Sequence, residues 1–168
     1  MTNSPTAPTV LRMRRVLDGS PLPAPEWPAG FRLVPFDPAV HPLPAHRLLV
    51  QAYAQGGGSV ADFDGWWNAL RTDEEYDPNL CFVAVSEAEG AVVGFAQCWT
   101  SAFVKDIAVS PGLRRQGLGR ALLREVFRAF QDRGAGSVDL KVEADNPSGA
   151  VRFYQAMGMV VVGEGKTT

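Results

Sequence analysis

The feature that most constrains the fold of this chain is a strand-like run followed by a turn with two glycines and a long periodic helix. The run extends from Phe103 to Pro111, the turn is centred on Gly117 and Gly119, and the helix is expected to continue to Arg133. Such a junction directs several unpaired backbone N–H groups to one point, with the positive end of the helix dipole behind them. The stretch therefore predicts an anion site at a strand-to-helix turn.

The spacing of the turn residues argues against two familiar nucleotide loops. A phosphate-binding P-loop needs a Lys and a Ser or Thr after its second glycine, and this turn has neither. A dinucleotide-binding turn needs a third glycine, whose place is taken by Leu122. The motif Arg114-x-x-Gly117-x-Gly119 instead resembles the pyrophosphate loop, Gln/Arg-x-x-Gly-x-Gly/Ala, of the GNAT superfamily of acyl-CoA-dependent N-acyltransferases.

A second stretch downstream strengthens this resemblance. Residues 146–159 read NPSGAVRFYQAMGM. They are similar to the family's second signature, in which Asn, Ala, Tyr and Gly-Phe follow one another, with Met159 in the place of the usual Phe. Two signatures in the family's order indicate a member of that family.

The resemblance implies one domain of the α/β (α+β) class, with a mixed, mostly antiparallel sheet that is splayed at the acyl-CoA site and flanked by helices on both faces. The order of strand and helix patterns along the chain favours the same mixed sheet. Residues 1–30 are expected to form a Pro-rich arm with one strand at Val10–Leu17, and residues 31–168 the acetyltransferase domain. Helices are expected at residues 43–54, 60–71, 117–133 and 147–157, and further strands at residues 31–36, 80–86, 91–100, 103–109, 138–142 and 160–163. Ser59 and Asp62 are expected to open the second helix, and Asn146 to cap the fourth.

The end of the sequence departs from the family's fold. That fold closes with a hairpin whose final strand lies beside the strand expected here at residues 138–142, and the sequence stops at Thr168 without room for it. A vacant slot would leave two strands with unpaired backbone groups. We expect the Val10–Leu17 strand to fill the slot, either within the chain or swapped from a second subunit in a homodimer.

Composition and charge narrow the class of protein. A hydrophobic content of 46% and a charged content of 20% are ordinary for a soluble globular domain. The net charge of -2 and the lack of a basic tract with interleaved aromatics give no support for nucleic-acid binding. No apolar run approaches the ~18 residues of a membrane span, and Met1–Pro8 lacks the apolar core of a signal peptide. Cys81 and Cys98 show no metal-ligand spacing, so we expect reduced core cysteines in a cytoplasmic protein without a metal, a nucleic-acid partner or a membrane.

The resemblance implies acetyl-CoA as the acyl donor and an amine as the acceptor. The amine would attack the thioester carbon through a tetrahedral intermediate, with CoA thiolate leaving. Backbone N–H groups of the turn are expected to hold the pyrophosphate, and the Val109 N–H is the best candidate donor to the oxyanion. The expected cofactor-binding residues are Ile107, Ala108, Val109, Arg114, Arg115, Gln116, Gly117, Leu118, Gly119, Arg120, Ala121, Asn146 and Tyr154.

Proton transfer needs an acid and a base. Tyr154 corresponds to the tyrosine that many family members use as general acid, and a phenol with a pKa of about 10 suits a thiol with a pKa of about 8.5. The alternative is a core aromatic whose hydroxyl is satisfied nearby. Lys141 stands where some relatives have a glutamate base, so the candidate bases are Glu143, Asp106 and Tyr76, with water-mediated deprotonation as an open alternative.

The sequence leaves the acceptor and two other functions open. An acidic lip would attract a cationic amine, and its residues are Asp62, Asp64, Asp73, Glu74, Glu75, Asp77, Glu87 and Glu89. A long acidic groove would favour a peptide amine, whereas an aromatic pocket around Trp66, Trp67 and Trp99 would favour a small amine. The alternatives to an enzyme are a non-catalytic acyl-CoA-binding sensor or scaffold, and a structural protein whose glycine turn is only a connection.

Overall fold

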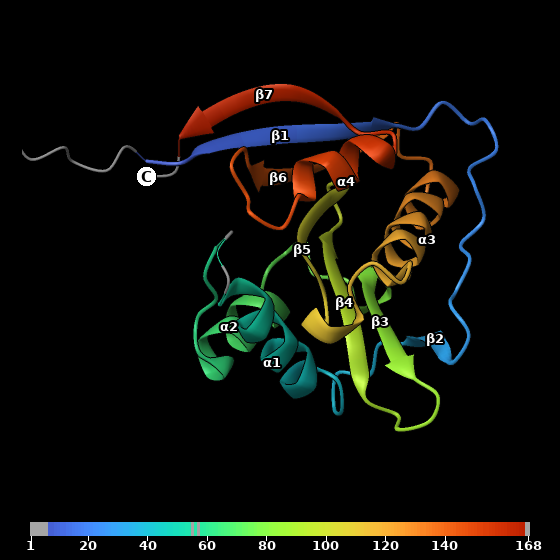
Figure 1. The fold of residues 1–168 in the computed structure, drawn as a ribbon, viewed down its shortest axis with the longest axis vertical. Helices are drawn as coiled ribbons and strands as arrows, with labels where there is room; N and C mark the ends of the chain where they lie inside the picture. Colours follow the sequence, from blue (N-terminus) through green and yellow to red (C-terminus); the bar gives the residue numbers. More distant parts are fainter. Residues whose placement is uncertain (1–6, 55, 57, 167–168) are drawn as a thin grey trace, which may run out of the picture.

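The computed structural model describes residues 7–54, 56 and 58–166, so residues 1–6 of the expected arm lie outside the described part. One sheet of seven strands has the order β2-β3-β4-β5-β6-β1-β7, with helices on both faces (Figure 1). Among the described strands only β5 and β6 run parallel, so the mixed, mostly antiparallel sheet is confirmed. The strands are β1 (Thr9–Val16), β2 (Phe31–Pro35), β3 (Cys81–Ser86), β4 (Val92–Trp99), β5 (Phe103–Val109), β6 (Ser137–Glu143) and β7 (Val160–Lys166), and the helices are α1 (Pro42–Tyr53), α2 (Phe63–Arg71), α3 (Leu118–Asp132) and α4 (Ala150–Ala156).

The N-terminal strand β1 lies between β6 and β7 (Figure 1). It pairs antiparallel with β6 from Val10 opposite Glu143 to Val16 opposite Ser137. Met13, in the middle of the strand, is fully buried. The expectation that the N-terminal strand fills the vacant slot is therefore confirmed, and it does so within the chain.

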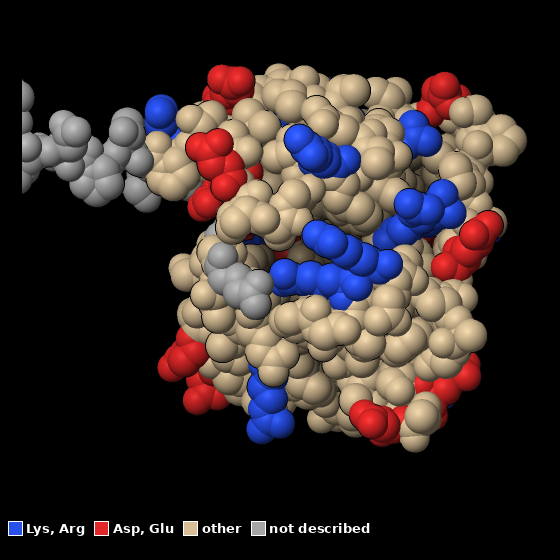
Figure 2. Space-filling model, viewed as in Figure 1, with Lys and Arg blue, Asp and Glu red and all other residues tan. Residues whose placement is uncertain are grey.

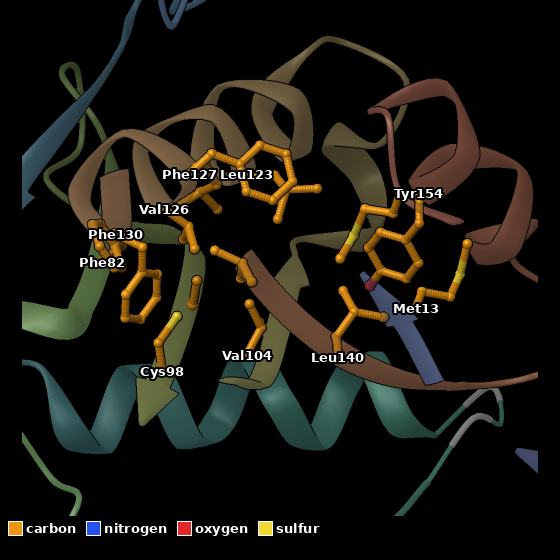
Figure 3. Packing of buried hydrophobic residues seen from close by; sticks show 14 of the residues in the cluster. Met13, Phe82, Cys98, Val104, Leu123, Val126, Phe127, Phe130, Leu140 and Tyr154 are labelled. Carbon is orange, nitrogen blue, oxygen red and sulfur yellow. The ribbon is translucent and has the colours of Figure 1, made fainter. Parts of the chain in front are cut away.

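Two hydrophobic clusters occupy opposite faces of the sheet. The first gathers residues of α3, α4, β1 and β6, and includes Tyr154 (Figure 3). The second gathers residues of α1, α2, β3 and β4, and includes Trp66. On α3 the buried side chains recur every three or four residues, as an amphipathic helix on a sheet requires.

The segment between β1 and β2 is extended and follows α3 (Figure 1). The indole Nε1 of Trp27 donates to Glu125 Oε1 at 3.2 Å, and Gln131 Nε2 donates to the Ser20 carbonyl at 3.1 Å. The prolines of this segment explain why it forms no helix or inner strand. Strand β1 belongs to the same sheet as the rest of the chain. The boundary at residue 30 stays a prediction.

Two predicted helix starts are wrong. Helix α2 begins at Phe63, because the Asp62 carboxylate accepts from the Gly65 N–H and caps the helix there, leaving Ser59 outside it. Helix α4 begins at Ala150 rather than at residue 147. The Asn146 side chain accepts from the Ser148 N–H, two residues on, in a turn of its own, and Gly149 in the left-handed conformation (φ 75°) then starts the helix.

Candidate active site

A cleft opens where β5 and β6 part. The two strands pair at Phe103 opposite Asp139 and at Val104 opposite Leu140, and the described residues show no further pairing between them. The register between β4 and β5 shifts at the same point, so that Lys105 is an extra residue that bends β5. The cleft that follows has a volume of about 670 Å³. Its described lining residues are Ala52, Tyr53, Gly56, Val104, Lys105, Ile107, Ala108, Val109, Leu113, Arg114, Arg115, Gly117, Gly119, Arg120, Leu140, Lys141, Val142, Asn146, Pro147, Ser148, Ala150, Phe153 and Tyr154.

The backbone of β5 faces this cleft at alternate residues. The Ser110 N–H donates to the Val93 carbonyl at 2.8 Å, and Val109 lies opposite Gly94 in the same register. Residues of an antiparallel ladder bond to the neighbouring strand alternately, so the Val109 N–H points away from β4 and toward the cleft. This is the position that an oxyanion donor requires.

The glycine turn closes one end of the cleft. Gly117 has a φ of 95°, in the left-handed region that favours glycine, and it starts α3. A Cβ on Gly119 would lie 3.4 Å from Phe153 Cζ, at ordinary van der Waals distance, so Gly119 faces the Phe153 ring of α4. The side chains of Leu118 and Ala121 are buried in the core, and these two residues can offer a ligand only their backbone.

The charge of the cleft is positive. Five cationic residues line it, and none of its described lining residues is Asp or Glu; the cations are Lys105, Arg114, Arg115, Arg120 and Lys141. Figure 2 shows Lys and Arg gathered around the hollow in the middle of this face, with most Asp and Glu toward its margins. A concave surface with one sign of charge concentrates ligands of the opposite sign, here polyanions.

Tyr154 reaches the cleft from α4. Its side chain is buried near Leu140 and Met13 (Figure 3). Burial raises the pKa of Tyr154 to about 12. The phenol therefore stays protonated at neutral pH and is able to donate a proton or a hydrogen bond.

Tyr53 is a cleft residue that no motif of the sequence predicts: it is the last residue of α1 and lines the cleft. Its hydroxyl donates to the carboxylate of Asp106, a buried residue of β5. Lys105 Nζ lies 3.2 Å from the other carboxylate oxygen of Asp106. Burial and the nearby negative charge raise the pKa of Tyr53 far above its ordinary value. The only sequence signal for Tyr53 was a hydroxyl at the end of an otherwise apolar helix face.

The structure separates other candidates from this cleft. Glu143 ends β6 opposite Val10, and neither it nor Gln116 is among the lining residues. Tyr76 packs edge-on against Trp67, with ring centroids 6.0 Å apart, in the cluster on the α1 and α2 face. By contrast, Ile107, Ala108, Val109, Asn146, Tyr154 and the turn residues Arg114, Arg115, Gly117, Gly119 and Arg120 all line the cleft.

Much of the expected acidic lip has structural roles. Asp62 caps α2, Glu75 accepts from the Ser101 N–H at 2.9 Å, and Asp77 pairs with Arg133 at 2.7 Å. Trp66 is a core residue. The described residues contain no cluster of three metal-ligating side chains and no helix that is long and apolar enough to cross a bilayer.

Comparisons with known proteins agree on one family. The model of the Acetyltransferase (GNAT) family matches residues 46–159. The streptothricin acetyltransferase of Streptomyces lavendulae is 35% identical over 130 residues, which cover 74% of this chain and 64% of that protein. A mycothiol acetyltransferase of Thermobispora bispora is 34% identical over 163 residues, which cover 88% of this chain and 52% of that protein. The chain thus spans less than two thirds of the first relative and about half of the second.

Solved structures show the same fold. A GCN5-related N-acetyltransferase from Sphaerobacter thermophilus superposes with a TM-score of 0.81 at 29% identity, over 95% of this chain and 50% of that chain. Ard1 from Thermoplasma volcanium superposes with a TM-score of 0.62 at 22% identity, over 80% of this chain and 86% of that chain.

Proposed function

We propose that this chain, which belongs to the Acetyltransferase (GNAT) family, transfers the acetyl group of acetyl-CoA to a primary amine. The observation that carries the proposal is the cleft at the parting of β5 and β6, where unpaired backbone groups, a glycine turn and five cationic side chains meet. Coenzyme A presents a diphosphate and a further phosphate at one end and a thioester at the other. The cationic part of the cleft at the N-terminus of α3 suits the phosphates of coenzyme A. The unpaired backbone groups along β5 suit its thioester end.

Each step of the reaction is assigned to a particular group in the cleft. N–H groups of the Gln116–Ala121 turn hold the diphosphate, and Arg115 and Arg120 add positive charge. The Val109 N–H donates to the thioester oxygen as it becomes an oxyanion. The amine nitrogen bonds to the carbonyl carbon, the C–S bond breaks, and the departing thiolate takes the phenolic proton of Tyr154.

The acceptor is proposed as a small cationic amine or a peptide amine. The names of the two curated relatives specify small molecules, streptothricin and mycothiol, which favours the first class. Among the described residues Cys81 and Cys98 are both free and buried, which supports the expected cytoplasmic setting. Strand β1 completes the sheet within the chain, so no swapped strand is needed for it. The homodimer stays a prediction.

A thiol-release assay beside a calorimetric titration of CoA tests the proposal. Wild-type protein should bind CoA and release thiol from acetyl-CoA in the presence of one class of amine. Gly117→Glu, which forces a side chain into a left-handed position and adds a negative charge, should weaken CoA binding about tenfold or more. Arg120→Glu reverses one exposed charge of the cleft without straining the turn, and should weaken binding in the same direction.

Gly136→Glu is the matched control, because Gly136 is exposed, has open space around its Cβ position and is not a lining residue of the cleft. CoA binding without turnover on any amine would favour a sensor or scaffold over an enzyme. No measurable CoA affinity in the wild-type protein would refute the proposal.

A further inference from the structure

Two tyrosines reach the cleft from opposite faces of the sheet. Tyr154 belongs to the hydrophobic cluster on the α3 and α4 face, whereas Tyr53 packs against the cluster on the α1 and α2 face. Both line the cleft at the point where β5 and β6 part. A thioester held there would therefore have one phenol on each side, and acetyl transfer as described above uses only Tyr154.

Asp106 lies behind Tyr53. Its side chain is 9% exposed and is not among the lining residues, so a molecule in the cleft meets Tyr53 and Lys105 instead of the carboxylate. One carboxylate oxygen accepts from the Tyr53 hydroxyl, and the other lies 3.2 Å from Lys105 Nζ. The other titratable groups around the pair are Tyr154 and the fully buried thiol of Cys98 on β4, whose pKa is raised by burial. Asp106 is thus connected to the cleft through the Tyr53 hydroxyl, which donates a hydrogen bond to its carboxylate.

We propose that Tyr53 and Asp106 form a proton relay that removes a proton from the ammonium form of the acceptor amine. The inference rests on the proposed function and assigns its base. The ammonium group gives a proton to Tyr53 Oη while the Tyr53 hydroxyl proton passes to the Asp106 carboxylate. The neutral amine nitrogen then bonds to the thioester carbon and loses its second proton to solvent. The C–S bond breaks and the thiolate takes the Tyr154 proton, so the acceptor loses two protons, the thiolate gains one, and one proton is released overall. After product release Asp106 gives up its proton through Tyr53, and solvent restores Tyr154.

The chemistry of Tyr53 and Asp106 requires that the two proton transfers are coupled. A phenol with a raised pKa is neutral at physiological pH and is a poor base by itself. It can accept a proton only while it passes its own to an adjacent carboxylate, and Asp106 is placed to receive it. In this scheme Tyr53 touches the amine, whereas Asp106 acts through Tyr53.

A purely structural role is the alternative, since the same hydrogen bond ties α1 to β5. Two nucleophiles distinguish the roles. A primary alkylamine arrives at neutral pH as an ammonium ion that must lose a proton, whereas hydroxylamine arrives neutral. A relay matters for the first nucleophile much more than for the second, and a structural tie affects both equally.

The test compares kcat and KM for both nucleophiles in Tyr53→Phe and Asp106→Asn. For the alkylamine we expect kcat to fall on the order of 10²–10⁴-fold in either variant, with the loss shrinking as the pH rises toward the pKa of the amine. The double variant should lose little more than each single one, because the two residues act as a unit. Hydroxylamine turnover and CoA affinity should remain close to wild type.

The matched control is Tyr76→Phe, which removes a phenolic hydroxyl outside the cleft. A second readout needs no turnover. The chain contains three tyrosines, so ¹³C labelling at Cζ gives three resonances that the three Phe variants assign. Adding the alkylamine to the CoA-loaded protein should shift the Tyr53 resonance and leave that of Tyr76 in place.

The outcomes separate the relay from the proposed function. A wild-type protein that binds CoA but acetylates neither nucleophile contradicts both. Turnover that survives in Tyr53→Phe as well as in Tyr76→Phe, or losses that are equal for the two nucleophiles, overturn the relay alone. A Tyr53 resonance that does not respond to the amine overturns it as well.

Discussion

The two edges of β6 behave in opposite ways. Along one edge β6 pairs with β1 over the whole length from Val10 to Val16, in a single register. Along the other edge it pairs with β5 at only two positions before the strands part. The same strand therefore has one closed edge and one open edge, and the open edge lines the cleft.

The contrast shows how a sheet can hold unpaired backbone at a binding site. Orphaned N–H and C=O groups destabilise a buried strand unless water or a ligand satisfies them. The closed edge offsets that cost, because β1 contributes backbone hydrogen bonds, the buried side chain of Met13 and ion pairs to Asp139. Stability and ligand binding are thus assigned to different edges of one strand, and each can be perturbed separately.

The most damaging way to break the closed edge is to truncate its buried centre. Met13→Ala should lower the free energy of unfolding by about 2–5 kcal/mol, because truncating this fully buried side chain leaves a cavity in the cluster on the α3 and α4 face. Urea unfolding measures the change. Val16→Ala on the same strand is the control: Val16 is exposed, so its change should stay within about 0.5 kcal/mol. Similar losses in both variants would mean that β1 is not packed as described.

A smaller loss should follow from removing the charge of Asp139, which accepts hydrogen bonds from Arg14 and Arg12 on β1. Asp139→Asn should cost about 1–3 kcal/mol at pH 7. Hydrogen bonds from the two guanidinium groups, that of Arg14 first, lower the pKa of Asp139 in the folded protein. Its contribution is therefore complete above the unfolded pKa of about 3.9 and is lost as the pH falls through the folded value.

Urea unfolding of wild type and Asp139→Asn at several pH values checks this sign. The difference between the two proteins should be constant near neutrality and should vanish in acid. Glu89→Gln, in the exposed turn between β3 and β4, should show no such pH-dependent difference. A difference that grows as the pH falls would contradict the account.

Substitutions in the glycine turn, at the end of the cleft that the open edge lines, should have the smallest effect on stability and a clearer effect on CoA binding. Gly117→Ala should cost about 1–2 kcal/mol, because its φ of 95° is unfavourable for a residue with a Cβ, and should weaken CoA binding as the turn relaxes. Gly119→Ala should change stability by less than about 1 kcal/mol, toward stabilisation, because its Cβ fits at 3.4 Å from Phe153 and Ala favours the helix. Thermal unfolding and CoA titration of both variants measure the contrast. Equal effects at the two glycines would contradict it.

The order of strands and helices and the position of the glycine turn were predictable from local patterns in the sequence. The placement of β1 was predictable for a different reason: a family fold with a vacant slot needs some strand to fill it. The start of α4 was not, because Asn146, Pro147 and Gly149 suit a separate turn as well as a helix start.

The pairing of Tyr53 with Asp106 could not be predicted from local pattern. The two residues are separated by 53 positions, and Tyr53 follows the apolar face of its helix, where an aromatic residue is ordinarily core. Only the packing of α1 against β5 brings its hydroxyl to the carboxylate. Local pattern also fails for Glu143: its sequence neighbours Lys141 and Val142 line the cleft, whereas Glu143 does not.

Amide hydrogen exchange with and without acetyl-CoA tests the central claim most directly, because it observes both edges of β6 in one experiment. Acetyl-CoA should slow exchange at Val109 and in the Gly117–Ala121 turn, while the amides shared by β1 and β6 should be slow in both states. Saturation with acetyl-CoA that leaves Val109 and the turn unprotected, or that protects the β1 and β6 pair instead, would contradict it.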